Sequence, residues 1–378
     1  MIGPNQYLLE MLRHSPELAA QAVVLFHEQN DAADDYREIG CAVGIDEAVG
    51  QIRAQVSFGN ICRVFTRHTA GLMRLMKAVR ENQPHLLVSN TEQLMIGGMV
   101  ARMRGIPHVK VFHALTFAHR LTGRPFVKRV YLVLLSLWCD VIVAVSETMK
   151  EALLSGGVPA SRVVTIANPL DCTRLRVDAQ KPLPADLDAL LAHRHPIVLS
   201  AGVIFPKKGQ DRLIEAMPEL RSVHPGICCV LAGGVGERSG LEDTVGYFHS
   251  LQKRVKELNL ESCVVFVGDT PHLPALMNRS DVYVQTSRTE SFCRSVAEAL
   301  VCGAPVVAYA VGAIPEAAGP GGVMVRDGDT AGLVESILAL LADPARGKRL
   351  AEEGGRYVSD HFDAPTVSRK FSDMMASL

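Results

Sequence analysis

The sequence predicts an α/β protein made of two domains, each built on a parallel sheet. The chain has 378 residues, more than one hydrophobic core usually serves. Apolar runs rich in β-branched residues alternate with helical patterns, which is typical of a parallel sheet covered on both faces. A turn-rich region between residues 167 and 196 separates two such series.

The apolar runs define the strands that we expect in each domain. The first series is 22–26, 85–89, 109–112 and 141–145, and the second is 197–200, 228–231, 264–267, 282–284 and 306–308. We expect two Rossmann-like domains, at residues 1–172 and 173–355, with ligands at the carboxyl ends of their strands. Residues 356–378 are expected to form a C-terminal helix that crosses back to the N-terminal domain.

Composition narrows the class of partner and the compartment. The net charge is only −1, so the chain has no global basic field, and we do not expect nucleic acid as a partner. The nine cysteines are scattered without a Cys-x-x-Cys pair, which indicates buried free thiols in a reducing cytoplasm. No signal-peptide pattern is visible, and the longest apolar stretch, 130–145, is too short to span a membrane.

Two glutamates eight residues apart are the strongest chemical signal. Glu290 ends a loop after the strand at 282–284, and Glu298 lies about two turns into the next helix, which is expected to stop at Gly303. Free backbone N–H groups at a helix start suit a phosphate, and carboxylates accept hydrogen bonds from sugar hydroxyls. Two solvated surface glutamates would have the same spacing, so the pair by itself leaves the function open.

The segment from Glu290 to Val307 resembles the Glu-x7-Glu donor-binding segment of family 4 glycosyltransferases. Further segments similar to motifs of that family are 144–147, 166–171, 200–211, 266–268 and 280–282. The resemblance extends over nearly the whole chain. It implies the GT-B fold, in which two Rossmann-like domains face each other across a cleft, and it implies glycosyltransferase activity.

The resemblance also implies roles for individual side chains. Glu290 would bind hydroxyls of the transferred sugar, and Glu298 would hold the ribose hydroxyls. Lys208 would neutralise the diphosphate, where charge develops as the glycosidic bond breaks. The alternative is that Lys208 is a solvated lysine in a turn, without a functional role. Arg294, at the start of the Glu298 helix, is a substitute cation.

Five further positions match the family's donor site. The backbone amides of Ser291, Phe292 and Cys293 would face the sugar or the diphosphate, and Gly202 belongs to the matching strand-to-helix loop. His113 follows the strand at 109–112 and matches a family histidine at the mouth of the cleft. A polar strand end is the plain alternative for His113.

Three departures from the family pattern affect the donor site. Val203 stands where the family has an arginine, so one phosphate cation is missing. Ser291 and Cys293 replace family glycines, which narrows the space beside the sugar. Gly3 would match the glycine-rich loop near the diphosphate, but the strand that should precede it is absent, through truncation or an unusual N-terminal sheet.

The resemblance implies a retaining mechanism without a metal or a cofactor. No Asp-x-Asp metal motif occurs in a suitable loop, so we expect turnover to survive chelation. The expected partner is a nucleotide-sugar donor, with UDP as the family's common choice. The acceptor is not identified; a lipid-linked molecule and a polysaccharide are both open.

The segment from Arg120 to Trp138 raises the question of a membrane contact. It places Arg120, Arg124, Lys128 and Arg129 before an apolar run, a pattern that suits an anionic membrane surface. An ordinary core helix with a solvated basic end has the same pattern. A peripheral position at the inner face of a membrane therefore stays open.

Three other functions compete with the glycosyltransferase. The loop at 234–240 has the spacing of a dinucleotide loop, but Glu257, the acidic residue about twenty positions on, lies in a helical stretch and not at a strand end. An NAD(P) oxidoreductase is therefore disfavoured. A nucleotide-sugar epimerase with the same fold, and a non-catalytic sugar-nucleotide-binding subunit, remain as alternatives.

Overall fold

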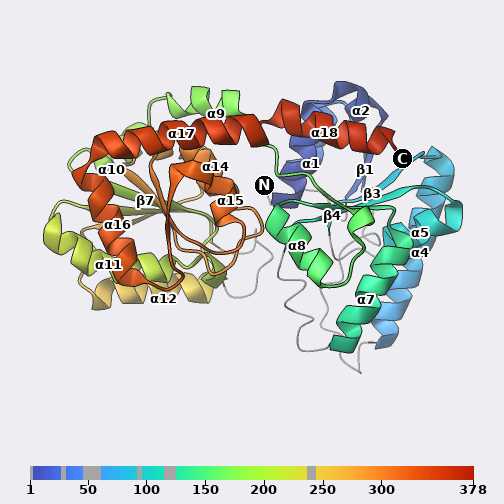
Figure 1. The fold of residues 1–378 in the computed structure, drawn as a ribbon, viewed down its shortest axis with the longest axis horizontal. Coiled ribbons are helices and arrows are strands. Elements are labelled where there is room, and N and C mark those ends of the chain that lie inside the picture. Colours follow the sequence, from blue (N-terminus) through green and yellow to red (C-terminus); the bar gives the residue numbers. More distant parts are fainter. Residues whose placement is uncertain (1–2, 27–30, 46–60, 92–95, 115–124, 236–243) are drawn as a thin grey trace. The chain divides into compact units, whose positions relative to one another are not determined.

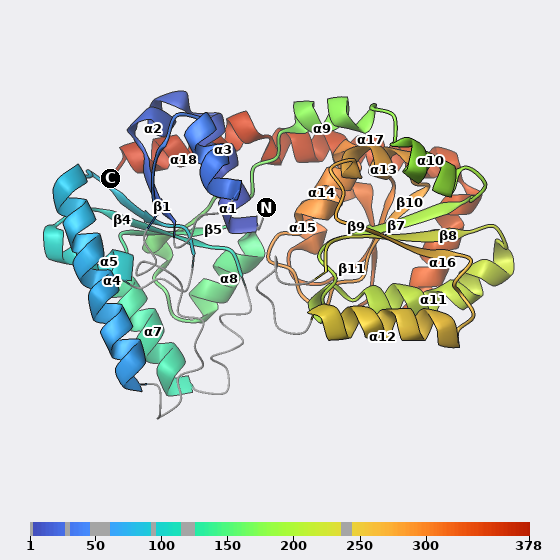
Figure 2. The same cartoon turned by 180° about the vertical axis from the view of Figure 1, so that it is seen from behind.

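The computed structural model describes residues 3–26, 31–45, 61–91, 96–114, 125–235 and 244–378. The chain divides into two compact units: unit 1 comprises Met1–Pro169 and Ala364–Leu378, and unit 2 comprises Leu170–Asp363. Figures 1 and 2 show the ribbon from opposite sides.

Unit 2 is an alternating series of strands and helices. Its strands are β7 (Ile197–Ala201), β8 (Cys228–Ala232), β9 (Val264–Gly268), β10 (Val282–Gln285), β11 (Val306–Tyr309) and β12 (Gly322–Val325). Its α-helices are α9 (Cys172–Ala179), α10 (Ala185–Leu191), α11 (Gln210–Val223), α12 (Thr244–Glu257), α13 (Leu273–Arg279), α14 (Arg294–Val301), α15 (Ile314–Ala318), α16 (Thr330–Ala342) and α17 (Pro344–Phe362).

The six strands of unit 2 form one parallel sheet in the order β12-β11-β10-β7-β8-β9. The first strand of the series, β7, therefore lies in the middle and pairs with both β8 and β10. The chain winds outward from β7 in one direction and then returns to start again at β10. The carboxyl ends of β7 and β10 are the topological switch point, where open α/β sheets bind ligands.

Helices cover both faces of the unit 2 sheet (Figures 1 and 2). Buried residues of α11, α12 and α16 pack with inward-facing strand residues such as Val198 and Val284 in one continuous hydrophobic core. On the other face, α14 packs against α9 and α17. Because both faces are buried, the strands carry unbroken apolar runs, which explains why these strands were visible in the sequence.

Unit 1 contains two separate parallel sheets in the described residues. Its strands are β1 (Val23–Phe26) and β2 (Ala42–Ile45), which pair with each other, and β3 (Leu87–Ser89), β4 (His108–Phe112), β5 (Val141–Ala144) and β6 (Val163–Thr165), which form a four-stranded sheet in that order. Its α-helices are α1 (Gly3–Arg13), α2 (Pro16–Gln21), α3 (Asp31–Glu38), α4 (Ile61–Asn82), α5 (Ile96–Arg104), α7 (Pro125–Trp138), α8 (Glu147–Ser155) and α18 (Ala364–Ala376).

The C-terminal helix α18 belongs to unit 1, where it packs against α1. The rings of Tyr7 and Phe371 meet edge to face at 6.4 Å. The observed division falls between Pro169 and Leu170 and not at 172/173, and the returning segment begins at Ala364 and not at 356. The reason is local: Leu170 N donates to Phe362 O at 2.9 Å, so α17 stays with unit 2.

Three strands were not expected from the sequence, namely β2, β6 and β12. Each lies at the edge of its sheet or in the two-stranded pair, and each is only partly buried. A strand with one exposed side needs no continuous apolar run, so the pattern that indicated the central strands is missing here. Among the described helices, none is long and apolar enough to cross a membrane.

Candidate donor site of unit 2

Two loops at the switch point carry the two most important predicted residues. Lys208 lies in a short 3₁₀ turn, η4 (Pro206–Lys208), which follows β7. Glu290 lies in the loop that follows β10. Because β7 and β10 are neighbours in the sheet, the side chains meet: Lys208 Nζ donates to Glu290 Oε1 at 2.6 Å.

A chain of hydrogen bonds between buried polar side chains connects the Glu290 carboxylate to strand β10. Ser287 Oγ donates to Glu290 Oε1 at 2.8 Å, and Gln285 Nε2 donates to Ser287 Oγ at 2.7 Å. The side-chain oxygen of Gln285, Oε1, in turn accepts hydrogen bonds from the hydroxyls of Tyr283, at 2.9 Å, and Ser295, at 3.2 Å. A buried network whose members are all satisfied is rigid, so Glu290 is held in one orientation.

The backbone at Glu290 is fixed as well. Ala313 N donates to Glu290 O at 3.1 Å. Gly312 has φ +55°, and a Cβ at this position would lie 2.1 Å from Glu290 O. Only glycine allows this close approach, so the loop before α15 stabilises the position of Glu290.

Burial and pairing together keep both groups of the Lys208–Glu290 pair charged. Burial alone favours the neutral forms, but the Glu290 carboxylate outweighs it and raises the pKa of Lys208. For Glu290, burial likewise acts toward a higher pKa, and the ammonium of Lys208 and the hydrogen bonds lower the pKa below its ordinary value. The site therefore presents an ion pair of a buried carboxylate and a partly buried ammonium group, which can interact with both an anion and hydroxyl groups.

The second glutamate lies in the middle of α14. Glu298 Oε1 is 3.2 Å from the Arg294 guanidinium, one helical turn away. Because α14 begins at Arg294, Glu298 lies one turn into the helix and not two turns, as the sequence suggested. Arg294 and Lys208 thus pair with different acids, and each predicted cation has a carboxylate of its own.

The three residues that follow Glu290, namely Ser291, Phe292 and Cys293, are buried. The Phe292 ring packs edge to face on Phe362 at 4.9 Å, so its side chain belongs to the core. Cys293 adopts a left-handed backbone with φ +71°, which is rare for a residue other than glycine. Burial, together with the Glu290 carboxylate, raises the pKa of the Cys293 thiol to about 12, so the thiol stays protonated at neutral pH.

Gly202 and Ser291 complete the predicted unit 2 residues. Gly202 follows β7 with φ +149°, and a Cβ there would lie 3.5 Å from Lys208 Cε. The Lys208 side chain therefore passes directly over Gly202. Ser291 is buried beside Glu290. The roles of the Ser291, Phe292 and Cys293 backbone amides stay predictions.

The remaining predicted residues, His113 and Gly3, belong to unit 1. His113 follows β4; its Nε2 is 2.8 Å from Asn90 Oδ1, and its ring meets that of Tyr7 edge to face at 5.0 Å. Burial lowers the pKa of His113 to about 3, so the imidazole is neutral at pH 7. Gly3 begins α1, so it lies in a helix and not in the glycine-rich loop that the resemblance implied.

Several residues of the site were missed in the sequence. Gln285 is a polar residue at the end of an otherwise apolar strand, and Ser287 lies three residues before Glu290; both signals were available. Arg288 carries no such signal, because a charged residue in a loop is usually solvated. Asp211 ends the segment 200–211 that resembles the family loop, but no role was assigned to it from the sequence.

The described residues cover the other hypotheses from the sequence, the dinucleotide loop and the basic segment, only in part. Glu257 is the last residue of α12, and most of the loop at 234–240 lies outside the described residues, as do Arg120 and Arg124. Within the described ranges, no cluster of three or more His, Cys, Asp or Glu side chains has an arrangement that could hold a metal ion.

Two protein-family models match the chain, one for each half. The model for glycosyl transferases group 1 matches residues 188–356, and the model for glycosyltransferase family 4 matches residues 2–174. The first match contains Lys208, Glu290 and Glu298.

Curated relatives are similar at a lower level of identity. A GDP-mannose-dependent α-(1-6)-phosphatidylinositol monomannoside mannosyltransferase of Mycolicibacterium smegmatis is 27% identical over 63% of this chain and 62% of its own length. D-inositol 3-phosphate glycosyltransferase 1 of Catenulispora acidiphila is 27% identical over 91% of this chain and 83% of its own length. The chain thus spans less than two thirds of the mannosyltransferase, and it spans 52% of a Mycobacterium tuberculosis glycogen synthase.

Solved structures share the fold along the whole chain. Anabaena HepE, in complex with UDP and glucose, superposes with a TM-score of 0.82 at 21% identity, covering 100% of this chain and 96% of HepE. A sucrose-phosphate synthase of Thermosynechococcus elongatus has a TM-score of 0.72 at 21% identity, covering 97% and 91%. With both halves matched by glycosyltransferase models and with a fold like that of HepE, the chain belongs to the family 4 glycosyltransferases of the GT-B superfamily.

Proposed function

We propose that this protein is a retaining glycosyltransferase that moves a sugar from a nucleotide-diphosphate donor to a hydroxyl acceptor. The observation that carries the proposal is the Lys208–Glu290 ion pair at the carboxyl ends of β7 and β10. A cation there suits a diphosphate, and an ionised carboxylate beside it suits sugar hydroxyls. Glu298, one turn into α14, is the group assigned to the ribose.

The proposed mechanism uses positioning and charge stabilisation. Lys208 balances the negative charge that grows on the diphosphate as the glycosidic bond breaks. Glu290 orients the sugar through its hydroxyls, while a diphosphate oxygen accepts the proton of the attacking acceptor on the same face. In this proposal Glu290 binds the sugar and is not a nucleophile; its Oε1 accepts hydrogen bonds from Lys208 and Ser287.

A donor panel tests the proposal directly. The candidates are UDP-glucose, UDP-N-acetylglucosamine and GDP-mannose, since HepE structures contain UDP and UDP-glucose whereas the mycobacterial relative is named for GDP-mannose. We expect UDP to be released from a UDP-sugar, slowly without an acceptor. NMR of the transferred sugar should show the anomeric configuration of the donor; an inverted product would contradict the proposed mechanism.

The same panel separates the competing functions. An epimerase would convert the donor into a second sugar nucleotide without losing the diphosphate. A non-catalytic binding subunit would bind a nucleotide in calorimetry but release no diphosphate. Binding of NADH in place of a sugar nucleotide would indicate the oxidoreductase.

Metal independence is part of the proposal and has its own test. Lys208 and Arg294 provide the positive charge that a divalent cation supplies in other transferases. We expect EDTA to leave turnover intact. A loss of more than about tenfold that Mg²⁺ or Mn²⁺ restores would contradict the assignment.

We further propose that unit 1 contacts an anionic membrane surface, where a lipid-linked acceptor is available. Helix α5 packs against both α4 and α7. Four apolar side chains on these helices are more than half exposed, namely Met73, Met103, Val133 and Leu137. Arg74, Lys77, Arg102 and Arg104, on α4 and α5, are exposed as well. Exposed apolar side chains beside basic ones suit the surface of a bilayer with anionic lipids.

Co-sedimentation with vesicles tests the membrane contact. Binding to vesicles that contain phosphatidylserine is expected at low salt and should weaken as salt rises. Leu137→Glu should abolish it, and Val223→Glu, at an equally exposed position of unit 2, should not. If the unaltered chain stays in the supernatant, the exposed side chains have another role. A cytoplasmic location remains a prediction from the sequence.

A further inference from the structure

The two loops that carry Lys208 and Glu290 are in contact not only through these side chains but also through Gly209 and Thr286. Thr286 Oγ1 donates to Gly209 O at 2.7 Å. Gly209 has φ +69°, and a Cβ at this position would lie 2.1 Å from Thr286 O. The turn after β7 is therefore pressed against the segment after β10, and the relative position of the two loops sets the distance between Lys208 and Glu290.

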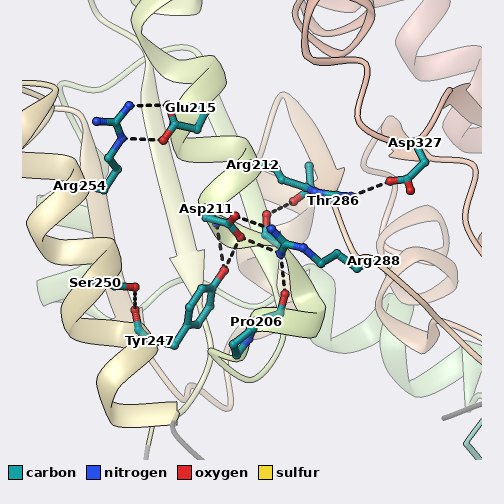
Figure 3. Close-up of polar contacts among 11 residues, drawn as sticks. Pro206, Asp211, Arg212, Glu215, Tyr247, Ser250, Arg254, Thr286, Arg288 and Asp327 are labelled. Atoms are coloured by element: carbon teal, nitrogen blue, oxygen red, sulfur yellow. Dashed lines mark hydrogen bonds and ion pairs between the residues drawn. The ribbon is translucent and has the colours of Figure 1, made fainter. Parts of the chain in front are cut away.

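Arg288 connects the same two loops from the outside (Figure 3). Its backbone N–H donates to Lys207 O at 2.8 Å, and its guanidinium donates to Pro206 O at 2.6 Å. The guanidinium also binds both oxygens of Asp211, at 2.9 and 2.6 Å. Arg288 thus holds both ends of the turn that contains Lys208.

Tyr247 completes the arrangement from helix α12. Its hydroxyl donates to Asp211 Oδ1 at 2.6 Å and accepts from Asp211 N at 3.1 Å. Burial acts to raise the pKa of Asp211, but the hydrogen bonds from Arg288 and Tyr247 outweigh it and lower that pKa. Asp211 is therefore an ionised, fully hydrogen-bonded group at the start of α11.

Helices α11 and α12, which carry Asp211 and Tyr247, are also joined by a second ion pair, and a comparison with it shows how the position of Arg288 differs. Arg254, on α12, binds both oxygens of Glu215, on α11, at 2.6 and 2.8 Å, and Figure 3 shows both pairs. The exposed fractions are similar: 40% and 34% for Arg288 and Asp211, against 39% and 43% for Arg254 and Glu215. Such exposed pairs contribute little to stability. The Arg254 pair joins α11 and α12, whereas the Arg288 pair joins the loop after β10 to the first turn of α11, directly after the turn that carries Lys208.

We propose that Arg288 and Asp211 are positioning residues for the reaction: together with Tyr247 they fix the turn at 206–208 so that Lys208 stays within hydrogen-bond distance of Glu290. This inference rests on the proposed function of the Lys208–Glu290 pair. Its reason is geometric, because a displacement of about 1 Å at a reacting centre can cost up to about a hundredfold in rate.

The experiment compares Arg288→Leu with Arg254→Leu. Each variant removes one bidentate surface pair and one further hydrogen bond, to Pro206 O for Arg288 and to Glu257 for Arg254, so the two should have similar melting temperatures. In donor hydrolysis with UDP-glucose, or with GDP-mannose if that is the donor used, Arg288→Leu should lower kcat about tenfold and leave KM within about twofold. Arg254→Leu should change neither constant by more than about twofold.

Two further variants exclude a purely structural role. Arg288→Lys keeps the charge but not the planar fork, and it should restore kcat only in part. Asp211→Asn should lower kcat as well, and the double variant Asp211→Asn/Arg288→Leu should be no slower than the slower single one, because both act through one contact.

Crystal structures of Arg288→Leu and Arg254→Leu give a readout that does not depend on activity. The distance from Lys208 Nζ to Glu290 Oε1 should exceed hydrogen-bond range in the first and stay near 2.6 Å in the second. If the two variants have equal kcat values or equal distances, the positioning role is wrong. If the unaltered chain hydrolyses no donor, the proposed function has failed, and the two distances still decide the positioning role.

Discussion

Unit 2 builds its interior around one six-stranded sheet that helices cover on both faces, whereas unit 1 has two separate sheets in its described residues. The buried polar groups differ in the same way. In unit 2, Gln285, Ser287 and Glu290 gather at the carboxyl end of the sheet. In unit 1, the buried side chains of His108 and Lys110 lie along β4 itself.

This difference indicates a division of roles between the units. The donor-site groups of unit 2 lie at the carboxyl ends of β7 and β10, where the loops of that unit hold them in a fixed geometry. Unit 1 keeps polar groups inside its sheet, where each must be satisfied locally; His108, for example, contacts Ser89 and the carbonyl of Trp138. We therefore expect substitutions in unit 2 to affect catalysis, and changes of pH to affect the stability of unit 1.

The largest effect is expected at Lys208. Lys208→Ala should lower kcat by roughly 10²–10³, the loss that follows removal of one well-placed oxyanion donor, because charge grows beside this side chain in the transition state. Lys207→Ala, the adjacent control, should be mild. Steady-state kinetics of donor hydrolysis measure both. Nearly full kcat in Lys208→Ala, with a loss in Arg294→Ala, would transfer the role to Arg294.

The two glutamates of unit 2 should differ in nucleotide binding. Glu298→Ala should weaken binding of the bare nucleoside diphosphate by about 1.5–3 kcal/mol, the value of one charge-assisted hydrogen bond. Glu290→Ala should spare the bare nucleotide and weaken binding or turnover of the nucleotide-sugar. Calorimetric titration with UDP and with UDP-glucose separates the two; an equal loss of UDP binding in both variants would contradict the assignment.

Acid should destabilise unit 1 more than unit 2. Burial lowers the pKa of His108 to about 4 and that of His113 to about 3. A histidine that is buried neutral stabilises the fold above its unfolded pKa of about 6.5, and this contribution is lost as the pH falls toward the folded pKa. The loss between pH 7 and pH 5 is at most about 2 kcal/mol for each histidine.

The only tryptophan, Trp138, lies in α7 of unit 1, so its fluorescence in urea reports on that unit. The urea midpoint should fall from pH 7 to pH 5, and it should fall less in His113→Gln. Hydrogen exchange of the unit 2 strands should change less over the same range. Equal acid sensitivity of the two units would contradict the prediction that acid destabilises unit 1 more than unit 2.

The smallest effect is expected at Cys293. A left-handed backbone costs an ordinary residue about 1–2 kcal/mol, and the φ of Cys293 is +71°. Cys293→Gly removes that strain but loses the packing of a buried side chain, so the net gain in stability should be about 1 kcal/mol or less. Thermal unfolding measures the stability, and Cys302→Gly, at a buried position with an ordinary backbone, should be destabilising. A lower melting temperature in Cys293→Gly would show that packing outweighs strain.

Much of the fold was predictable because both faces of its central strands are buried. The runs at 197–200, 228–231, 264–267, 282–284 and 306–308 all became strands of unit 2. The family and the GT-B fold followed from motifs in local sequence and were confirmed by the family models and by the shared fold. Edge strands such as β12 were missed, because a half-exposed strand shows no such run.

The sequence by itself thus determined the central strands of unit 2, the family and the residues Lys208, Glu290 and Glu298 as candidates. Only the tertiary structure decided how these residues are paired. Lys208 and Glu290 are 82 residues apart in the chain and meet because β10 inserts beside β7 and not beside β9. Arg288 and Asp211 are 77 residues apart, and their contact depends on the same strand order, which no local pattern contains.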